Sequence, residues 1–409
     1  MNILLINHYA GSKYYGMEYR PFYLAREWVR LGHNVAIVAG SFSHVRNLNP
    51  SVDDNYCEEI IDGVKYVWLK TPYYQGNNSK RVWNIFTFIK RLYQYRSSLV
   101  KDYMPDVVIA SSTYPFDIFP ARYIARSYRA KLIYEVHDLW PLSPIGLGGM
   151  SKWNPFIMLM QHAENFAYKS AHKVVSMLPR AKDYMQEHGM EPHKFNHVPN
   201  GVAVDEWEDS NQDLPNEHRN VIIDLKSSGK FLVGYLGSHG ASNALHVLIH
   251  VARILRNEPV GFVLVGQGPE KENLRRKAME CGLNNVAFLP PVSKATVQTL
   301  LNCMDVLFIG WLGLKLYRFG VSPNKLMDYM MAAKPVIHAI ETGNDMVAES
   351  DCGISVPAED PKAIADAVLK IMDMSSQERE EMGMRGRKYV MEHHDYKVLA
   401  KRFLEVMES

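Results

Sequence analysis

The residues that point most directly to chemistry lie between Phe319 and Pro335, around the predicted start of a helix. Ser322 followed by Pro323 predicts an N-cap with proline at the first helical position, just ahead of Asn324. A helix that begins directly after a strand presents free N–H groups and a positive dipole end to a ligand. The pattern therefore predicts an anion site at this helix start.

Lys325 falls in the first turn of that predicted helix. A cation there is unfavourable by up to about 1 kcal/mol against the helix dipole unless an anion is bound. This favours a phosphate ligand, while a solvated surface lysine is the alternative. Asp328, on the same helix, can reach a ribose hydroxyl or serve merely as a surface acid. Arg318 and Lys315 precede the helix and are further candidates for contacting phosphate.

Glycines follow two predicted strands and allow a phosphate to approach the backbone closely. One loop contains Gly237, Ser238, His239 and Gly240, and the other begins at Gly266. The dinucleotide signature G-x-G-x-x-G needs a third glycine, but position 271 is Lys. The sequence therefore disfavours NAD and FAD as cofactors.

His137 and Asp138 directly follow the predicted strand Leu132–Val136, at the end of a parallel strand where catalytic groups collect. A histidine satisfied in the core is the alternative for His137, and His8 and His239 are weaker candidates. The chain has no Asp-x-Asp pair, and its four cysteines lack metal-ligand spacing. We therefore expect that the protein has no metal site and that it functions in the reducing cytosol.

Two series of alternating strands and helices would position these residues. Such alternation predicts an α/β fold with two doubly wound parallel sheets, whose ligands bind at the carboxyl ends of the strands and in a cleft between the sheets. We expect domains at 1–202 and 203–390, and a C-terminal helix over 391–409 that packs back on the first domain. The predicted strands are Ile3–Asn7, Val35–Ala39, Asp106–Ala110, Leu132–Val136, Phe231–Leu236, Val260–Val265, Val286–Leu289, Val306–Ile309 and Val336–Ala339.

Composition and charge limit the functional classes. The chain has 409 residues, of which 47% are hydrophobic, so it is too long for one compact domain. Its net charge of +2 is uneven: residues 1–200 carry 23 Lys and Arg against 16 Asp and Glu, and the remaining residues carry 23 against 28. No apolar run is long enough to span a membrane, and the N-terminus lacks a signal-peptide pattern. The sequence predicts a soluble cytosolic protein without a nucleic-acid partner.

A basic amphipathic segment covers residues 80–101. Between Gly63 and Lys101 there are eight basic residues and no acid, and apolar side chains from Val82 to Tyr93 form one helical stripe. Such a helix can lie on an anionic membrane, or it can pack on the sheet with a solvated basic face. The two interpretations are compatible.

Motifs spread over essentially the whole chain resemble glycosyltransferase family 4, whose members are retaining, nucleotide-sugar-dependent enzymes of the GT-B fold. The matching motifs are Gly32-His33-x-Val35, His137-Asp138, Val198-Pro-Asn-Gly201, Val265-Gly-x-Gly-Pro269 and Asp328 to Pro335. The segments Gly16–Trp28 and Asp138–Leu142 resemble those of bacterial O-antigen and other surface-polysaccharide enzymes, including N-acetyl-L-fucosamine transferases.

The resemblance implies an acceptor-binding N-terminal domain and a C-terminal domain that binds the nucleotide-sugar. Gly16 would lie near the donor phosphates, His137 would contact the transferred sugar and Asp328 the ribose. Ser322 to Lys325 would hold the diphosphate, while the backbone of Leu289 and Pro290 would read the base. The acceptor side would include Tyr19, Arg20, Ser111 and Asp138.

Two positions depart from the family pattern. Position 320 is Gly where the family has the first glutamate of its Glu-x7-Glu motif. Ser238 and Asn243 stand where the family has a basic pair in the Gly237 loop. Lys325 and Arg318 would then have to supply the missing positive charge.

We therefore expect a retaining glycosyltransferase at the inner face of the cytoplasmic membrane. It would move an N-acetylated or 6-deoxy hexose from a UDP-sugar to a lipid-linked or growing glycan acceptor, without a cofactor or metal. The alternatives are a non-hydrolysing UDP-N-acetylhexosamine 2-epimerase and a non-catalytic sugar-nucleotide-binding protein. A dehydrogenase ranks last because the glycine fingerprint is absent.

Overall fold

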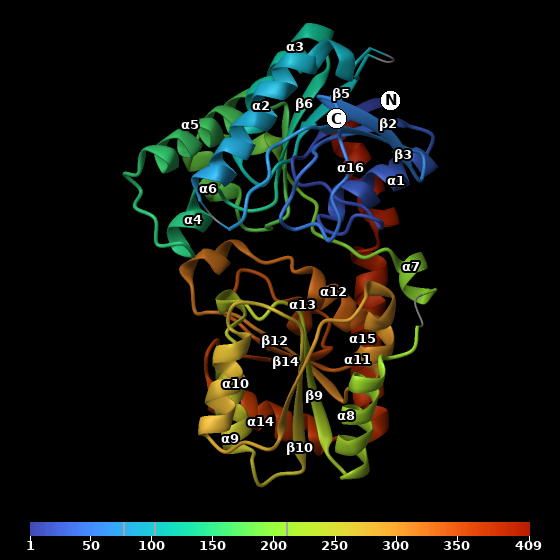
Figure 1. Cartoon of the computed structure of the whole chain (residues 1–409), viewed down its shortest axis with the longest axis vertical. Coiled ribbons are helices and arrows are strands. Elements are labelled where there is room, and N and C mark those ends of the chain that lie inside the picture. The colour runs from blue at the N-terminus through green and yellow to red at the C-terminus, as the bar shows by residue number, and fades with distance from the viewer. Residues whose placement is uncertain (77, 102–103, 210–211) are drawn as a thin grey trace. The chain divides into compact units, whose positions relative to one another are not determined.

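The computed structural model describes residues 1–76, 78–101, 104–209 and 212–409. The chain forms two compact units (Figure 1). The first comprises Met1–Asn200 together with Tyr396–Ser409, and the second comprises Gly201–Asp395. The chain therefore passes from one unit to the other twice, after Asn200 and after Asp395.

The first unit contains an eight-stranded sheet in the order β3-β4-β2-β1-β5-β6-β7-β8. Neighbouring strands are parallel except for β3 (Tyr56–Ile61), which is antiparallel to β4 (Val64–Leu69). The sequence did not predict this hairpin. Its turn residues Asp62 and Gly63 have φ values of 50° and 82°, and an Asp-Gly pair is a typical sequence signal for such a turn. The other strands are β1 (Asn2–Ile6), β2 (Asn34–Gly40), β5 (Val107–Ala110), β6 (Lys131–Val136), β7 (Lys173–Ser176) and β8 (Phe195–His197).

Helices cover both faces of this first sheet (Figure 1). On one face α1 (Arg20–Arg30) packs against α16 (Tyr396–Glu408), where Trp28 Nε1 donates to the carbonyl of Ala400 at 3.1 Å. On the other face lie α2 (Ser79–Leu99), α3 (Ile118–Tyr128) and α5 (Pro155–Ser170). Within the described residues, no helix is long and apolar enough to cross a membrane.

The second unit contains six parallel strands in the order β11-β10-β9-β12-β13-β14. The sequence predicts the first five of them in chain order, because their residues are mostly apolar. β9, β10, β12 and β13 are almost wholly buried, whereas the edge strand β11 is only partly buried. It misses β14, a partly exposed four-residue edge strand. The strands are β9 (Phe231–Leu236), β10 (Val260–Val265), β11 (Val286–Leu289), β12 (Val306–Gly310), β13 (Val336–Ala339) and β14 (Gly353–Val356).

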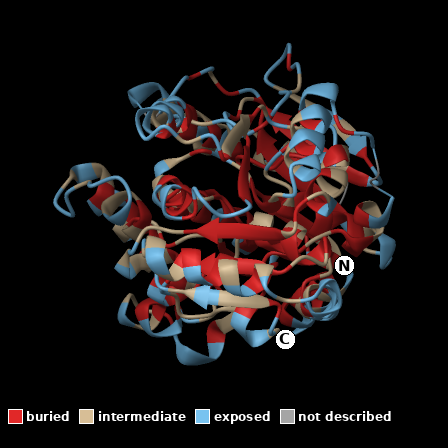
Figure 2. Cartoon of the chain, turned by 90° about the horizontal axis from the view of Figure 1, so that it is seen from below, coloured by how far each residue is buried: buried red, intermediate tan, exposed pale blue. Residues whose placement is uncertain are grey.

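Alternate residues of these strands pack into two separate cores. Val263 and Val265 join the core that includes α12 (Asn324–Met331), whereas Phe262 and Leu264 join the core with α9 (His246–Ile254) and α14 (Pro361–Met372). Figure 2 shows the strands as the buried layer beneath exposed helix surfaces. The loops at the carboxyl ends of the strands thus rest on a rigid sheet.

The C-terminal helical region differs from the single helix expected over 391–409. α15 (Ser376–His393) begins with a capping box between Ser375 and Glu378 and ends at His393, and α16 begins at Tyr396. The interruption falls where the chain passes back to the first unit. The other helices of the second unit include α8 (Asn216–Ser227), α10 (Lys271–Glu280), α11 (Val297–Asn302) and α13 (Met346–Glu349).

Candidate active site

Lys325 lies in the first turn of α12, where two uncharged side chains hold its ammonium group. Nζ donates to the hydroxyl of Tyr235 at 3.1 Å and to Oδ1 of Asn243. It also lies 5.0 Å from the centre of the Tyr235 ring. Burial lowers the pKa of Lys325 to about 8. Within the described ranges no carboxylate pairs with this lysine, so its charge is available to an anionic ligand.

The start of α12 differs from the prediction by one residue. Asn324 is the first helical residue, and Pro323 occupies the N-cap with φ −78° and ψ 131°. Ser322 therefore precedes the N-cap, and the N-cap residue Pro323 makes no side-chain hydrogen bond to the helix. The loop before it is fixed by Asn344, whose side chain accepts from the N–H of Val321 at 2.8 Å and donates to its carbonyl at 3.1 Å.

Arg318 does not share the contacts of Lys325. It is an exposed residue of η5 (Lys315–Phe319), and its guanidinium sits 4.6 Å from the centre of the Phe319 ring. In the part of the chain that the structure describes, no contact joins Arg318 to Lys325. Lys325, unlike Arg318, is thus hydrogen-bonded to Asn243 at the end of the Gly237 loop.

The two glycine loops meet backbone to backbone at the ends of β9 and β10. Gly237 N–H donates to Val265 O at 3.0 Å, and a Cβ on Gly266 would overlap the carbonyl oxygen of Gly237. Gly266 has φ +146°, a conformation that favours glycine. Gly240 is different, since a Cβ there would find its nearest neighbour at 3.5 Å.

Ser238 anchors both partners of Lys325 through its main-chain carbonyl. That oxygen accepts from the Tyr235 hydroxyl at 2.7 Å and from Asn243 Nδ2 at 2.9 Å. The adjacent His239 is fully buried, and its ring contacts the rings of Tyr235 and Phe288. Burial and the charge of Lys271 lower the pKa of His239 to about 4, so the ring is neutral at physiological pH.

A buried lysine that the sequence analysis did not select holds the next two loops together. Lys271 Nζ donates to Gly266 O at 2.8 Å and to Leu289 O at 2.9 Å. His218 Nε2 lies 2.9 Å from Pro290 O. The carbonyls of Leu289 and Pro290 are therefore hydrogen-bonded within the protein. That the backbone of these two residues reads a base stays a prediction.

Asp328 faces a small pocket of about 30 Å³, one turn along α12 from Lys325. Burial raises the pKa of Asp328 to about 6, although the charge of Lys294 opposes the shift. Val202, Ala203, Glu206, Trp207, Lys294 and Val297 complete the lining. Lys325 is not part of this lining. Within the described ranges, no group of three or more His, Cys, Asp or Glu side chains is arranged to hold a metal ion.

In the first unit, His137 is tied to two buried residues at the carboxyl edge of the sheet. Its Nε2 lies 3.0 Å from Ser111 Oγ and 3.3 Å from Glu135 Oε2. Ser111 is fully buried. Ser111 thus supports His137 in this conformation, and its contact with an acceptor stays a prediction.

Arg20 is likewise buried, although the sequence analysis placed it on the acceptor side. Its guanidinium pairs with Glu135 and donates to the carbonyls of Val198 and Pro199. All of these contacts lie within the first unit, where Arg20 supports Glu135 and the segment Val198–Pro199.

The remaining predicted residues of this unit lie on three different segments. Gly16, with φ +95°, bridges to Ser12 and Arg46 in the loop after β1. Tyr19 is half-buried at the start of α1, with its ring 6.0 Å from that of Tyr23. Asp138 is half-buried after β6, and burial raises its pKa.

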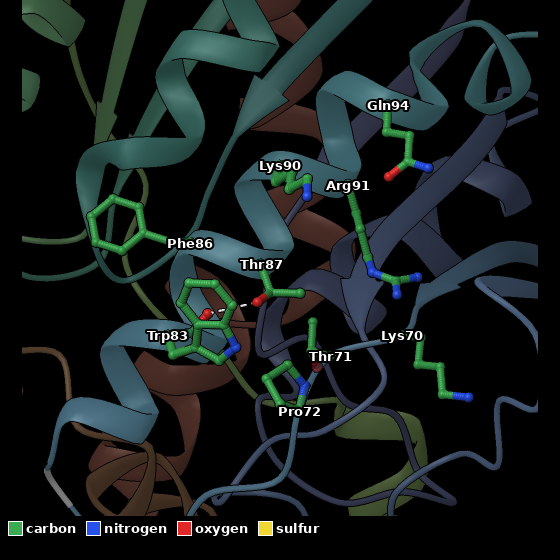
Figure 3. Close-up of a pocket in the computed structure, with 9 residues that line it drawn as sticks. All are labelled: Lys70, Thr71, Pro72, Trp83, Phe86, Thr87, Lys90, Arg91 and Gln94. Atoms are coloured by element: carbon green, nitrogen blue, oxygen red, sulfur yellow. Dashed lines mark hydrogen bonds between the residues drawn. The ribbon is translucent and has the colours of Figure 1, made fainter.

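A groove of about 630 Å³ runs beside α2 (Figure 3). Lys90 and Arg91 of α2 and Lys70 after β4 bring positive charge to it, and Trp83 and Phe86 bring aromatic surface. The lining contains no acidic residue, and Trp83 is 67% exposed. Both the basic and the aromatic character expected for residues 80–101 are therefore present on the surface.

Sequence reasoning missed Tyr235, Asn243, Lys271 and Glu135. Glu135 offered a signal, since it is a charged residue within the otherwise apolar run Leu132–Val136 of β6. Tyr235 and Asn243 offered little, because their importance depends on where Lys325 lies in space. The Gly237 loop alone does not reveal this partner.

Comparisons with known proteins cover both units. Residues 16–201 match a family model described as "Glycosyl transferase 4-like domain", and residues 230–374 match one described as "Glycosyl transferases group 1". The probable glycosyltransferase WbjE of Pseudomonas aeruginosa is 24% identical over 253 residues, which span 60% of this chain and 61% of WbjE. The match thus covers less than two thirds of the length of WbjE.

Two further relatives extend the comparison. WcaI of Escherichia coli (strain K12), whose name assigns it to colanic acid biosynthesis as a glycosyl transferase, is 25% identical over 68% of this chain and 69% of its own. The crystal structure of Anabaena Alr3699/HepE in complex with UDP and glucose matches 100% of both chains with a TM-score of 0.69 and 14% identity. This structural likeness confirms the expected GT-B class of two doubly wound α/β units.

Proposed function

We propose that this chain, which matches two glycosyltransferase family models over residues 16–201 and 230–374, transfers a sugar from a UDP-sugar to a lipid-linked or growing glycan acceptor in surface polysaccharide synthesis. The names of WbjE and WcaI support the class of reaction and pathway. UDP and glucose in the Alr3699/HepE complex support the donor class. The transferred sugar is proposed to be an N-acetylated or 6-deoxy hexose.

The observation that carries this proposal is the position of Lys325 between the start of α12 and the Gly237 loop. Its Nζ donates a hydrogen bond to Asn243, which occupies a position where glycosyltransferase family 4 has a basic residue. Lys325 would replace that charge on the donor diphosphate. A preorganised cation and free helix N–H groups would stabilise the negative charge of the leaving UDP, which is usually the largest contribution to such catalysis.

The other roles are assigned from the same resemblance. His137 would contact the transferred sugar, and Asp328 would bind the ribose hydroxyls. Retention would follow from attack on the face of the sugar that the diphosphate leaves, with the leaving phosphate helping to take the acceptor proton. This reaction requires neither a protein nucleophile nor a metal.

Residues 80–101 are proposed to bring the enzyme to the inner face of the cytoplasmic membrane. The acid-free groove beside α2 combines lysine and arginine with exposed tryptophan (Figure 3). Cations attract anionic headgroups, while an indole ring partitions into the membrane interface. The enzyme would then reach a lipid-linked acceptor at the membrane surface in which that acceptor is anchored.

Transfer is tested with radiolabelled UDP-N-acetylglucosamine and UDP-N-acetylgalactosamine, added with a lipid extract of bacterial membranes that contains polyprenyl-linked glycans. We expect label in the lipid fraction and release of UDP that depends on the extract. Lys325→Ala should abolish both. Lys334→Ala is the matched control, since Lys334 is also half-buried with its pKa lowered by burial but lies beyond the other end of α12. Conversion of the nucleotide-sugar without any lipid acceptor would identify an epimerase and overturn the proposal.

A further inference from the structure

A buried hydrogen-bond network fixes the position of every proton around Glu135 and Ser111. The Ser111 hydroxyl donates its single proton to Glu135 Oε2 at 2.5 Å. Asn7 Nδ2 donates to the Ser111 carbonyl at 2.6 Å and to Oγ at 3.2 Å. Ser111 Oγ therefore has only a lone pair left for its third neighbour, the His137 ring.

Glu135 is a carboxylate in this network. Burial alone would raise its pKa, but the Arg20 charge and the hydrogen bonds from His137 and Ser111 bring the pKa of Glu135 down to about 2. Both of its oxygens are thus acceptors. His137 Nε2 faces this carboxylate at 3.3 Å and Ser111 Oγ at 3.0 Å.

Two acceptors around one ring nitrogen determine the histidine tautomer. An unprotonated Nε2 would place its lone pair against the lone pairs of Ser111 and Glu135, so Nε2 must carry the proton. In the neutral ring Nδ1 is then the acceptor. Among the described residues, the hydrogen bonds of the His137 ring are made by Nε2, and the side chain is 10% exposed. Ser111 is no nucleophile here, because it is buried and gives its proton to Glu135.

Arg20 fixes the carboxylate from the opposite side. Its Nε donates to Glu135 Oε1 at 2.9 Å, and Nη2 donates to Val198 O at 2.9 Å while Nη1 donates to Pro199 O. Both side chains of the pair are completely buried. The guanidinium thus holds Glu135 against the last residues before the chain leaves the first unit at Asn200.

We propose that Glu135 and Arg20 are positioning residues that hold His137 as its Nε2–H tautomer, so that Nδ1 accepts a hydrogen bond from a hydroxyl group of the transferred sugar. The role in catalysis rests on the proposed function, whereas the tautomer does not. The carboxylate that orients the catalytic histidine of serine proteases shows how much this control can contribute, since its replacement by an amide lowers kcat about 10⁴-fold through the wrong tautomer.

The direct test is nitrogen NMR of the full chain labelled with ¹⁵N-histidine, with His137 assigned from His137→Asn. We expect the Nε2–H tautomer in the wild-type protein. This first measurement requires no substitution of Glu135 or Arg20. In Glu135→Gln the amide oxygen should face Arg20 and its NH₂ group should face Ser111 and His137. The ring should then switch to the Nδ1–H tautomer.

Arg46→Lys is the control for a purely structural effect. Arg46 is also buried and donates to backbone carbonyls, those of Ala10 and Gly40, but does not touch His137. It should leave the His137 signals unchanged. A wild-type Nδ1–H tautomer, or an unchanged tautomer in Glu135→Gln, would overturn the proposal whether or not the protein transfers a sugar.

Turnover supplies the second readout. Glu135→Gln should lower kcat for transfer by at least about 10-fold, because a protonated Nδ1 no longer accepts from the sugar hydroxyl. The Kd for UDP, measured by calorimetry, should remain that of the wild type, since Lys325 lies on the other unit. Unchanged kcat with a switched tautomer would refute the catalytic part of the proposal.

Discussion

At the scale of single residues, the candidate donor site depends on one lysine in unusual surroundings. Lys325 is half-buried, lacks a carboxylate partner among the described residues, and is hydrogen-bonded to Tyr235 and Asn243. These surroundings keep the cation in place but leave its charge uncompensated. A bound diphosphate would supply the compensation and raise the pKa of Lys325 from its value of about 8.

The lowered pKa of Lys325 predicts that the affinity for UDP depends on pH. Since the pKa of Lys325 in the free protein is about 8, its charge is present below pH 8 and is lost as the pH rises through that value. The Kd for UDP should therefore increase between about pH 7.5 and 9.5, where the phosphates themselves are fully ionised because their last pKa is about 6. Calorimetry across this range measures the effect. Lys325→Arg, which stays charged, should remove the dependence, and a flat wild-type profile would exclude Lys325 as the diphosphate ligand.

The sequence singled out Lys325 and His137 as candidates because each occupies a position with a local meaning, the first turn of a helix and the end of a strand. It could not identify Tyr235, Asn243 or Glu135 as their partners, because those contacts join elements far apart in the chain. The pairing of Arg20 with Glu135 was hidden for the same reason, because the two residues are 115 positions apart. The acceptor role that the resemblance implies for Arg20 stays a prediction.

At the scale of elements, β9, β10, β12 and β13 were predictable because both of their faces are buried, which gives continuous apolar runs. The partly buried edge strand β11 was also predictable, since all four of its residues are apolar. Short, partly exposed edge strands such as β14 and β8 lack that pattern. The predicted start of α12 was wrong by one residue. A Ser-Pro pair is compatible with serine as the N-cap and proline as the first helical residue, but in the structure Pro323 is itself the N-cap.

The contact between the two glycine loops yields a prediction for their backbone. Gly266→Ala should lower the free energy of unfolding by about 1–3 kcal/mol from the φ of +146° alone, and it should abolish UDP binding because the new Cβ displaces the Gly237 loop. Gly240→Ala is the matched control in extended backbone with φ −96°. It should change stability by less than about 0.5 kcal/mol. Urea denaturation and calorimetry compare the two, and equal effects would mean that the loop contact is unimportant.

At the scale of the whole molecule, the charge is divided between the units. The basic surface around α2 belongs to the first unit, while the excess of acids lies after residue 200. In the proposed reaction the basic first unit contacts an anionic membrane. The second unit binds an anionic nucleotide in spite of its acidic excess, so this binding must depend on local groups such as Lys325. The sequence predicted this division, because it follows from composition alone.

Membrane contact predicts salt-sensitive binding to vesicles. The protein should sediment with phosphatidylglycerol vesicles at low ionic strength but not with phosphatidylcholine vesicles, and salt should weaken the binding. Neutralising Lys80, Arg81, Lys90 and Arg91 together should remove it. Neutralising Arg275, Arg276 and Lys277, exposed cations of α10, should leave it intact. Equal losses from both sets would contradict a specific role for α2.

The central claim is that this chain binds a uridine nucleotide through Lys325. The most direct measurement is a thermal-shift screen of the wild type and Lys325→Ala against UDP, GDP, ADP, their sugar conjugates and NAD, because a ligand of the native state raises the melting temperature. We predict that UDP and UDP-N-acetylhexosamines stabilise the wild type by several degrees and leave the variant unshifted. No response to any nucleotide, or an equal response from the variant, would contradict the account.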